Sequence, residues 1–420
     1  MLDKAVVLCW LAFLLLNIVT EYITRFVGGV GVIVANYVFM VYFLLAYGKI
    51  TRKKIAMLPL FLFLFIYVIE YQFVWQSREI YTSFNVPFTL QVWHMISLVP
   101  MIISAVQVVT RSDEEMITWI RRCFEVMIIV VSIATIGILV VQPDAIRLSA
   151  ASKVEFYPLM ANYAVIYGMV ILLPYFFASF GENKHYRWLR GLIIALMMVC
   201  VFMAAFTIAI VGMVLGIGCY LFLNLKNATL RNVFLVAFIV FLVFFIQSGL
   251  YEMALLELAD LIPNDNISTR IYETVYYMQS GEEGQTTGRF DLYREAWGLI
   301  VKHPIIGNFP WNPHTKITGH STNLDLISSC GLIVFALYLK FIWNIVKYHL
   351  KYSVSQSEKN AVVASLIVFL FVSTFNPIWA SPVIMVLFIL GGLSVYRPML
   401  TQAESGASVK KEAKLYVRRR

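Results

Sequence analysis

The chain has 420 residues and a formal net charge of +9, and 60% of its residues are apolar while 14% are charged. Its mean hydropathy of +0.78 excludes a water-soluble domain of this length, because its apolar runs match the roughly 17–25 residues that cross a bilayer as a helix. These continuous runs also exclude a barrel, whose strands alternate apolar and polar residues over roughly 10 positions. We therefore predict an all-α polytopic membrane protein, in which membrane topology, not nucleic-acid binding, explains the basic balance.

Apolar stretches recur along the whole chain, and we expect twelve membrane spans. They lie near residues 5–20, 28–47, 55–74, 90–110, 123–142, 158–180, 192–206, 209–225, 233–250, 321–343, 361–377 and 381–396. The first lacks the small-residue pattern of a cleavage site, so we expect a retained helix. Residues 192–225 form either one overlong helix or a helical hairpin that turns near Phe206 and Thr207.

The placement of lysine and arginine decides between these two readings, since cytoplasmic loops are enriched in both residues. With a hairpin, 24 of the 33 Lys and Arg residues fall on one side, whereas one helix splits them 16 against 17. We therefore predict the hairpin, both termini cytoplasmic and a large loop outside. The chain then divides into nine spans (1–250), an external loop with short amphipathic helices (251–320), three spans (321–396) and a basic cytoplasmic tail (397–420) that contacts membrane lipids.

The segment 287–332, TGRFDLYREAWGLIVKHPIIGNFPWNPHTKITGHSTNLDLISSCGL, concentrates charged, aromatic and turn residues between apolar runs. Residues 289–302 predict an amphipathic helix. Further on, Thr322 followed three residues later by Asp325 fits a capping box, so we expect a helix to begin there. The free N–H groups of such a helix end attract phosphate. They also disfavour protonation of His320, which would leave its imidazole as a neutral base.

Arginine side chains suit a diphosphate, because the planar guanidinium donates bidentate hydrogen bonds and stays charged. Arg289 and Arg294 are about 140° apart around the predicted helix, so we do not expect both to face one ligand. A solvated ion pair is the alternative role for Arg294, and capping or packing is the alternative for His320. Further candidate substrate-binding cations lie in other outside segments, namely Arg147, Lys153, Arg270 and Lys316.

The sequence does not indicate a metal or nucleotide site. His314 and His320 are six residues apart, and the nearby acidic residues are not arranged as ligands. No Walker loop or dinucleotide fingerprint occurs. The five cysteines are scattered through apolar segments, which predicts neither a disulfide framework nor a thiolate metal site. We therefore expect no cofactor.

These features resemble the O-antigen polymerase and ligase superfamily (Wzy and WaaL type), which combines many spans with one large external loop late in the chain. GRFDLYREAWGLIVKHPIIGN is similar to the family pattern of an arginine, an amphipathic helix with Trp or Tyr, and His/Asn-Pro-x-x-Gly. HSTNLDLISSCGL is similar to the histidine segment that follows. The resemblance implies that His320 is the catalytic histidine and that Arg289 engages the donor pyrophosphate. The chain departs from the family at FTIAIVG near Thr207, where members often carry a basic residue.

The resemblance implies a metal-independent, inverting membrane glycosyltransferase. It would polymerise undecaprenyl-diphosphate-linked oligosaccharide repeat units into surface polysaccharide (O-antigen, capsule or exopolysaccharide) on the external face of the bacterial cytoplasmic membrane. A polysaccharide chain-length regulator is a further partner that the resemblance implies. Two alternatives stay open: a ligase that transfers finished glycan to a lipid A core, and a transporter of polysaccharide or lipid-linked sugar. A transporter should show pseudo-symmetric halves and charged or broken helices at mid-membrane, whereas here the polar residues gather in one loop.

Overall fold

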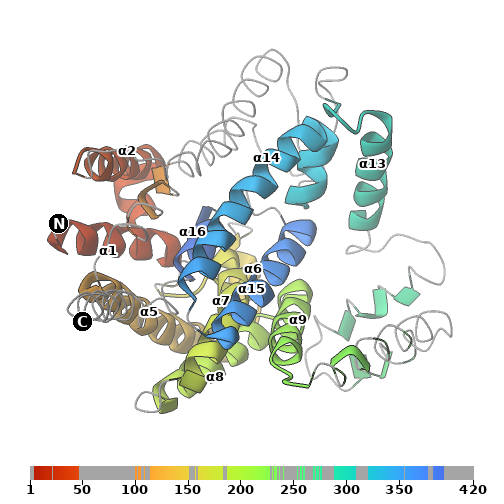
Figure 1. Cartoon of the computed structure of the whole chain (residues 1–420), viewed down its shortest axis with the longest axis horizontal. Helices are drawn as coiled ribbons and strands as arrows, with labels where there is room; N and C mark the ends of the chain where they lie inside the picture. Colours follow the sequence, from red (N-terminus) through yellow and green to blue (C-terminus); the bar gives the residue numbers. More distant parts are fainter. Residues whose placement is uncertain are drawn as a thin grey trace, which may run out of the picture.

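The structure is a computed structural model in which the described residues form helices and the turns between them (Figure 1). It describes residues 4–20, 22–46, 100–101, 103–105, 108, 114–150, 157, 159–182, 187–227, 229, 231–233, 236, 240, 253, 256–257, 259–260, 268–269, 271–273, 275–276, 288–308, 320–353, 355–376 and 382–391. No strand occurs among these residues. The all-α class predicted from composition is therefore confirmed.

The described part of the chain contains the following helices, given in chain order. They are α1 (Lys4–Thr20), α2 (Tyr22–Ala46), α5 (Glu114–Val141), α6 (Ala145–Ala150), α7 (Tyr163–Glu182), α8 (Arg187–Met203), α9 (Thr207–Leu223), α13 (Gly288–Lys302), α14 (Thr322–Tyr352), α15 (Gln356–Phe375) and α16 (Pro382–Gly391). Four helices of the described part are long and apolar enough to cross a membrane, namely α5, α7, α14 and α15. The expected span at 55–74, and most of those at 90–110 and 233–250, lie outside the described residues, so the count of twelve stays a prediction.

The hairpin predicted within residues 192–225 is confirmed. α8 ends at Met203 and α9 begins at Thr207, and the turn between them passes through Ala205, whose backbone has φ of 54°. The turn lies within a residue or two of the position expected from sequence. A left-handed residue is rare outside glycine and stops the helix here, which makes two helices of what composition alone would read as one.

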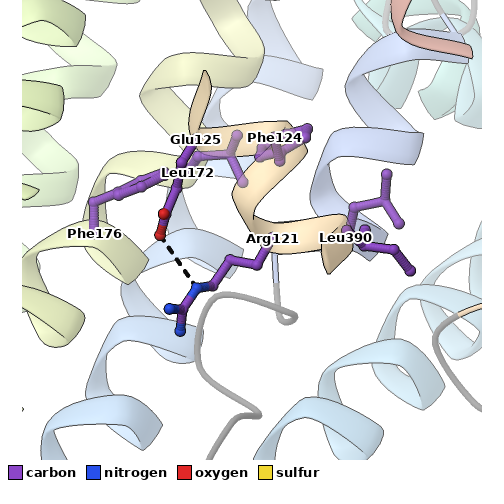
Figure 2. Close-up of a pocket in the computed structure, with 8 residues that line it drawn as sticks. Arg121, Phe124, Glu125, Leu172, Phe176 and Leu390 are labelled. Carbon is purple, nitrogen blue, oxygen red and sulfur yellow. Dashed lines mark ion pairs between the residues drawn. The ribbon is translucent and has the colours of Figure 1, made fainter. Parts of the chain in front are cut away.

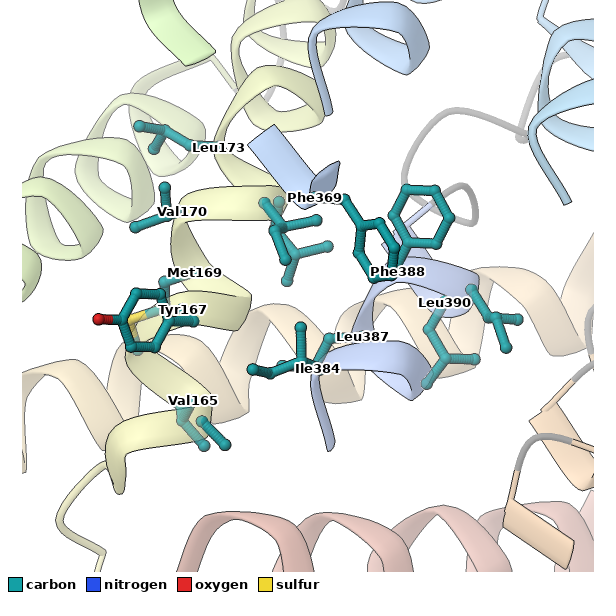
Figure 3. Close-up of a cluster of buried hydrophobic side chains, with 14 of the residues drawn as sticks. Val165, Tyr167, Met169, Val170, Leu173, Phe369, Ile384, Leu387, Phe388 and Leu390 are labelled. Carbon is teal, nitrogen blue, oxygen red and sulfur yellow. The ribbon is translucent and has the colours of Figure 1, made fainter. Parts of the chain in front are cut away.

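Helix α7 lies at the centre of the bundle, packed against α8, α9, α15 and α16. Figure 3 shows the cluster of buried side chains that α7, α15 and α16 form, in which the rings of Phe369 and Phe388 stack with centroids 4.4 Å apart. Small residues allow close approach: a Cβ added at Gly216 of α9 would lie 2.8 Å from a methyl group of Val368. Inside a bilayer, helices associate largely through such close packing, because their surfaces are already out of contact with water and the hydrophobic effect does not drive them together.

Side-chain contacts fix which helix ends meet. Tyr163 at the start of α7 contacts Phe206 before α9, with ring centroids 4.9 Å apart, and bonds to Asn376 after α15. The start of α14 bonds to the same asparagine through Thr322. We call the end of the bundle defined by these four residues the site end. Helices α7, α9 and α14 therefore begin at this end and α15 ends there, while the side of the membrane that each end faces stays a prediction.

Buried ionisable groups gather at the opposite end. The Arg121 Nε and Glu125 Oε1 of α5 are 3.2 Å apart, and both side chains are almost fully buried. Figure 2 shows this pair beside Phe176 of α7 and Leu390 of α16, around a hollow with room for about one water molecule. Charges in a membrane bundle are costly unless they are paired. Removal of one of the two charged side chains should therefore destabilise the bundle more than removal of both.

We expect Glu125→Gln to lower the free energy of unfolding by about 3–5 kcal/mol, because Arg121 would keep a buried charge without its partner. The double variant Arg121→Met/Glu125→Leu should lose much less, since it removes both charges. Unfolding in detergent measures both. Arg122→Met is the matched control, because this neighbouring arginine is exposed. A double variant as unstable as the single one would contradict this reading.

Candidate functional site

Arg289 and His320 lie at the beginnings of two helices that pack together. Arg289 is the second residue of α13, and His320 comes two residues before the start of α14. α13 packs against α14, and Figure 1 shows it beside the first part of that helix. The helix predicted at residues 289–302 is confirmed, and Ile300 of its apolar face is buried, whereas Trp297, which we expect on the same face from sequence, is exposed.

An aromatic contact places the beginning of α13 at the site end. The ring of Tyr293 lies edge-on against that of Phe375, the last residue of α15, with centroids 6.2 Å apart. Position 289 is one turn before Tyr293, on the same face of α13. Asn376, which follows Phe375, holds the start of α14. Positions 289 and 320 therefore come to the same end of the bundle, not to opposite surfaces.

Ser321 caps α14. Its hydroxyl accepts a hydrogen bond from the Leu324 amide at 3.1 Å, and its backbone is extended. The capping box expected from Thr322 and Asp325 is wrong: Thr322 is the first helical residue and Ser321 is the N-cap, because a cap needs a non-helical backbone. His320 is half-buried directly before this cap, beside the positive end of the helix dipole.

The start of α14 is anchored by a small polar network. The backbone oxygen of Asn376 accepts from the amide of Thr322 at 3.3 Å and from its hydroxyl at 3.2 Å. Asn323 Nδ2 donates to Thr374 Oγ1 at 2.9 Å, and the Tyr163 hydroxyl donates to Asn376 Oδ1. These bonds join α7, α14 and α15 next to the candidate histidine, so the helix end at the site is held by three elements.

The structure describes the other predicted cations to three different extents. Arg294 is described fully: its side chain is 80% exposed, and its Nη1 lies 3.5 Å from Asp291 Oδ1, as in the ion-pair alternative. Arg147 lies on α6, which packs on α7, but its side chain, like that of Arg289, is outside the described part. Wholly outside it are Lys153, Arg270 and Lys316. The substrate-binding role of all these residues stays a prediction.

The sequence analysis missed four residues of this network, namely Tyr163, Asn323, Thr374 and Asn376. The only signal for Asn376 is an amide at the end of an apolar run, before Pro377, and nothing in the sequence links it to Thr322, 54 positions earlier. Among the residues that the structure describes, no three His, Cys, Asp or Glu side chains gather as metal ligands. His314 lies outside this part.

Residues 192–339 match the family model described as O-antigen ligase. This part of the chain is O-antigen ligase-like. The match begins within α8 and ends within α14, so it includes the α8–α9 hairpin, α13 and His320. It supports a membrane enzyme of the O-antigen polymerase and ligase superfamily without separating polymerase from ligase. No curated protein matches the chain.

Tyr163→Phe should lower the thermal unfolding midpoint, because Asn376 Oδ1 would stay buried without its donor, which costs about 1–3 kcal/mol. Thermal unfolding of the purified protein in detergent measures the change. Tyr42→Phe is the control: this tyrosine of α2 is partly buried, and the described residues give its hydroxyl no hydrogen bond. Unchanged midpoints for both variants would show that the bond to Asn376 does not stabilise the bundle.

Proposed function

We propose that the chain is a membrane glycosyltransferase that polymerises undecaprenyl-diphosphate-linked oligosaccharide repeat units on the external face of the bacterial cytoplasmic membrane. One observation carries the proposal: Arg289 and His320 lie at one end of two packed helices, inside the segment that matches the O-antigen ligase family. A cation and an imidazole at the end of a membrane bundle suit a donor whose lipid is in the bilayer and whose diphosphate is at its surface.

In the proposed reaction, a hydroxyl of the acceptor sugar attacks the anomeric carbon of the donor. The bond from that carbon to the diphosphate oxygen breaks, the configuration inverts, and undecaprenyl diphosphate leaves. His320 takes the proton of the hydroxyl as a general base. His320 is half-buried and comes directly before the N-cap of α14, at the end of the bundle where the proposed donor would bind.

Arg289 stabilises the negative charge that grows on the departing diphosphate. A guanidinium can donate two parallel hydrogen bonds to phosphate oxygens, and stabilisation of developing charge is usually the largest contribution to catalysis. The donor already carries its activated leaving group, so the proposed reaction uses neither a nucleotide nor a metal ion. Additional cations would hold the rest of the diphosphate, with Arg147, Lys153, Arg270, Arg294 and Lys316 as candidates.

The membrane orientation belongs to the same proposal. Both termini are cytoplasmic, the site end faces outward, and the basic tail at residues 397–420 contacts the inner leaflet. A chain-length regulator would act on the same site from outside, because the growing polymer is held there.

An O-antigen ligase is a second candidate, because the matching family model carries that description. The purified protein, incubated with undecaprenyl-diphosphate oligosaccharide and no added metal, separates the two on a gel. A ladder of lengthened lipid-linked glycan identifies a polymerase. Transfer that occurs only after a lipid A core acceptor is added identifies a ligase, and no transfer with either acceptor contradicts both.

We expect His320→Ala to lower the transfer rate by roughly 10²–10⁴-fold, the usual contribution of a general base. Arg289→Ala should lower it by roughly 10²–10³-fold, as for the loss of one donor to developing charge. Initial rates per folded protein measure both. Lys302→Ala is the matched control, because this exposed cation lies at the far end of the same helix. Normal rates in the first two variants would overturn the assignment.

A further inference from the structure

Helix α14 contains a break whose missing hydrogen bonds are supplied by another segment. Gly331 has φ of 77° and ψ of 178°, far from helical values. In an unbroken helix, the amides of Leu332 and Ile333 would bond four residues back. They donate instead to Pro304 O at 2.8 Å and Ile305 O at 3.3 Å. Carbonyl groups of the turn that follows α13 thus accept the hydrogen bonds that the preceding turn of α14 would accept in an unbroken helix.

We call this contact the α13–α14 joint, made of residues 303–308 and 328–333. Its two glycines face each other across the backbone. Gly307 has φ of 75°, and a Cβ there would lie 2.0 Å from Ser329 O. A Cβ at Gly331 would lie 2.3 Å from Ile305 O and 2.5 Å from the Gly307 amide. Because these obstacles are backbone atoms, any side chain would force the two segments apart.

Asn308 ties the two helices together through its side chain. It is 3% exposed, and its Nδ2 donates to Leu299 O in the last turn of α13 and to Ser328 O in α14, both at 2.8 Å. Its backbone amide also donates to Ser328 O, at 3.0 Å. An aspartate has no N–H to donate, so it would bring a carboxylate against two carbonyl oxygens.

The joint and the site end hold α13 at two points. At the site end, Tyr293 contacts Phe375, and at the joint Asn308 grips the last turn of α13. The first segment of α14, from Thr322 to the break, runs between the same two points. The position of Arg289 relative to the start of α14 therefore depends on the joint.

We propose that Gly307, Asn308 and Gly331 are positioning residues that set α13 against the start of α14 and so aim Arg289 at the charge formed next to His320. The proposal rests on the function proposed above. Displacement of a catalytic group by about 1 Å can cost roughly 100-fold in rate. A loosened joint should therefore lower kcat while the protein stays folded.

A double-mutant cycle on the transfer rate per folded protein tests this role. We expect Asn308→Ala to lower kcat by roughly 10–100-fold and to change the donor KM much less. Arg289→Ala should then cost less in the Asn308→Ala background than in the unchanged protein, so that the double variant is about as slow as Arg289→Ala alone, because the guanidinium is already misplaced. Asn308→Asp should be at least as slow as Asn308→Ala. If the two single effects multiply, or if Asn308→Ala is fully active, the joint does not position Arg289.

Glycine variants provide the matched control. Gly298→Ala places its Cβ in open space on the same helix and should leave the rate unchanged, whereas Gly307→Ala and Gly331→Ala should lower it as Asn308→Ala does. If a glycine variant fails to fold, the Asn308→Ala variant still tests the positioning role, because this substitution only removes atoms and creates no steric clash. Failure of the proposed function and failure of this inference give different results. Normal rates for Arg289→Ala and His320→Ala would contradict the proposed function. Lower rates for those two variants, with normal rates for all joint variants, would contradict only the positioning role of the joint.

Discussion

Every backbone N–H and C=O inside a bilayer must find a partner within the protein, because hydrocarbon offers none. Most helices here meet this constraint by being unbroken. Helix α14 meets it through another segment: carbonyl groups in the turn after α13 accept hydrogen bonds from the amides that follow the break at Gly331. The amphipathic helix of the loop is thereby attached to the bundle without a disulfide among the described residues. A short helix that would be marginal in isolation is stabilised by this packing.

The two ends of the bundle use buried polar groups differently. At the site end, hydroxyls, amides and backbone carbonyls join three helices through neutral hydrogen bonds, as between Tyr163 and Asn376. At the opposite end, charged groups are paired or bonded to carbonyls, as where Arg190 donates to Ser179 O. The first turn of α14 also carries the half-buried Asp325, so the site end combines neutral anchors with a carboxylate beside the positive end of the helix dipole.

The sequence was sufficient for features that depend on local pattern. Apolar runs predicted the all-α class, the balance of Lys and Arg predicted the α8–α9 hairpin, and periodicity predicted α13. What it could not provide depends on partners far along the chain. Asn376 holds Thr322 across 54 positions, and the amides after the break at Gly331 donate to Pro304 and Ile305. The cap at Ser321 was missed because Ser321 and Thr322 are both good caps, and only the backbone conformation distinguishes them.

The α8–α9 hairpin shows where this chain departs from the family that it resembles. The turn carries no basic residue; instead Phe206 stands against Tyr163 and Tyr167, with ring centroids 4.9 and 6.2 Å apart. The hairpin therefore contributes an aromatic wall to the site end, and a second cation for a diphosphate has to come from another element. Arg294 is poorly suited, since it is paired with Asp291 and exposed. Helix α6 packs on α7 and follows the site-end terminus of α5, so it brings the backbone of Arg147 to the end where the charge is needed.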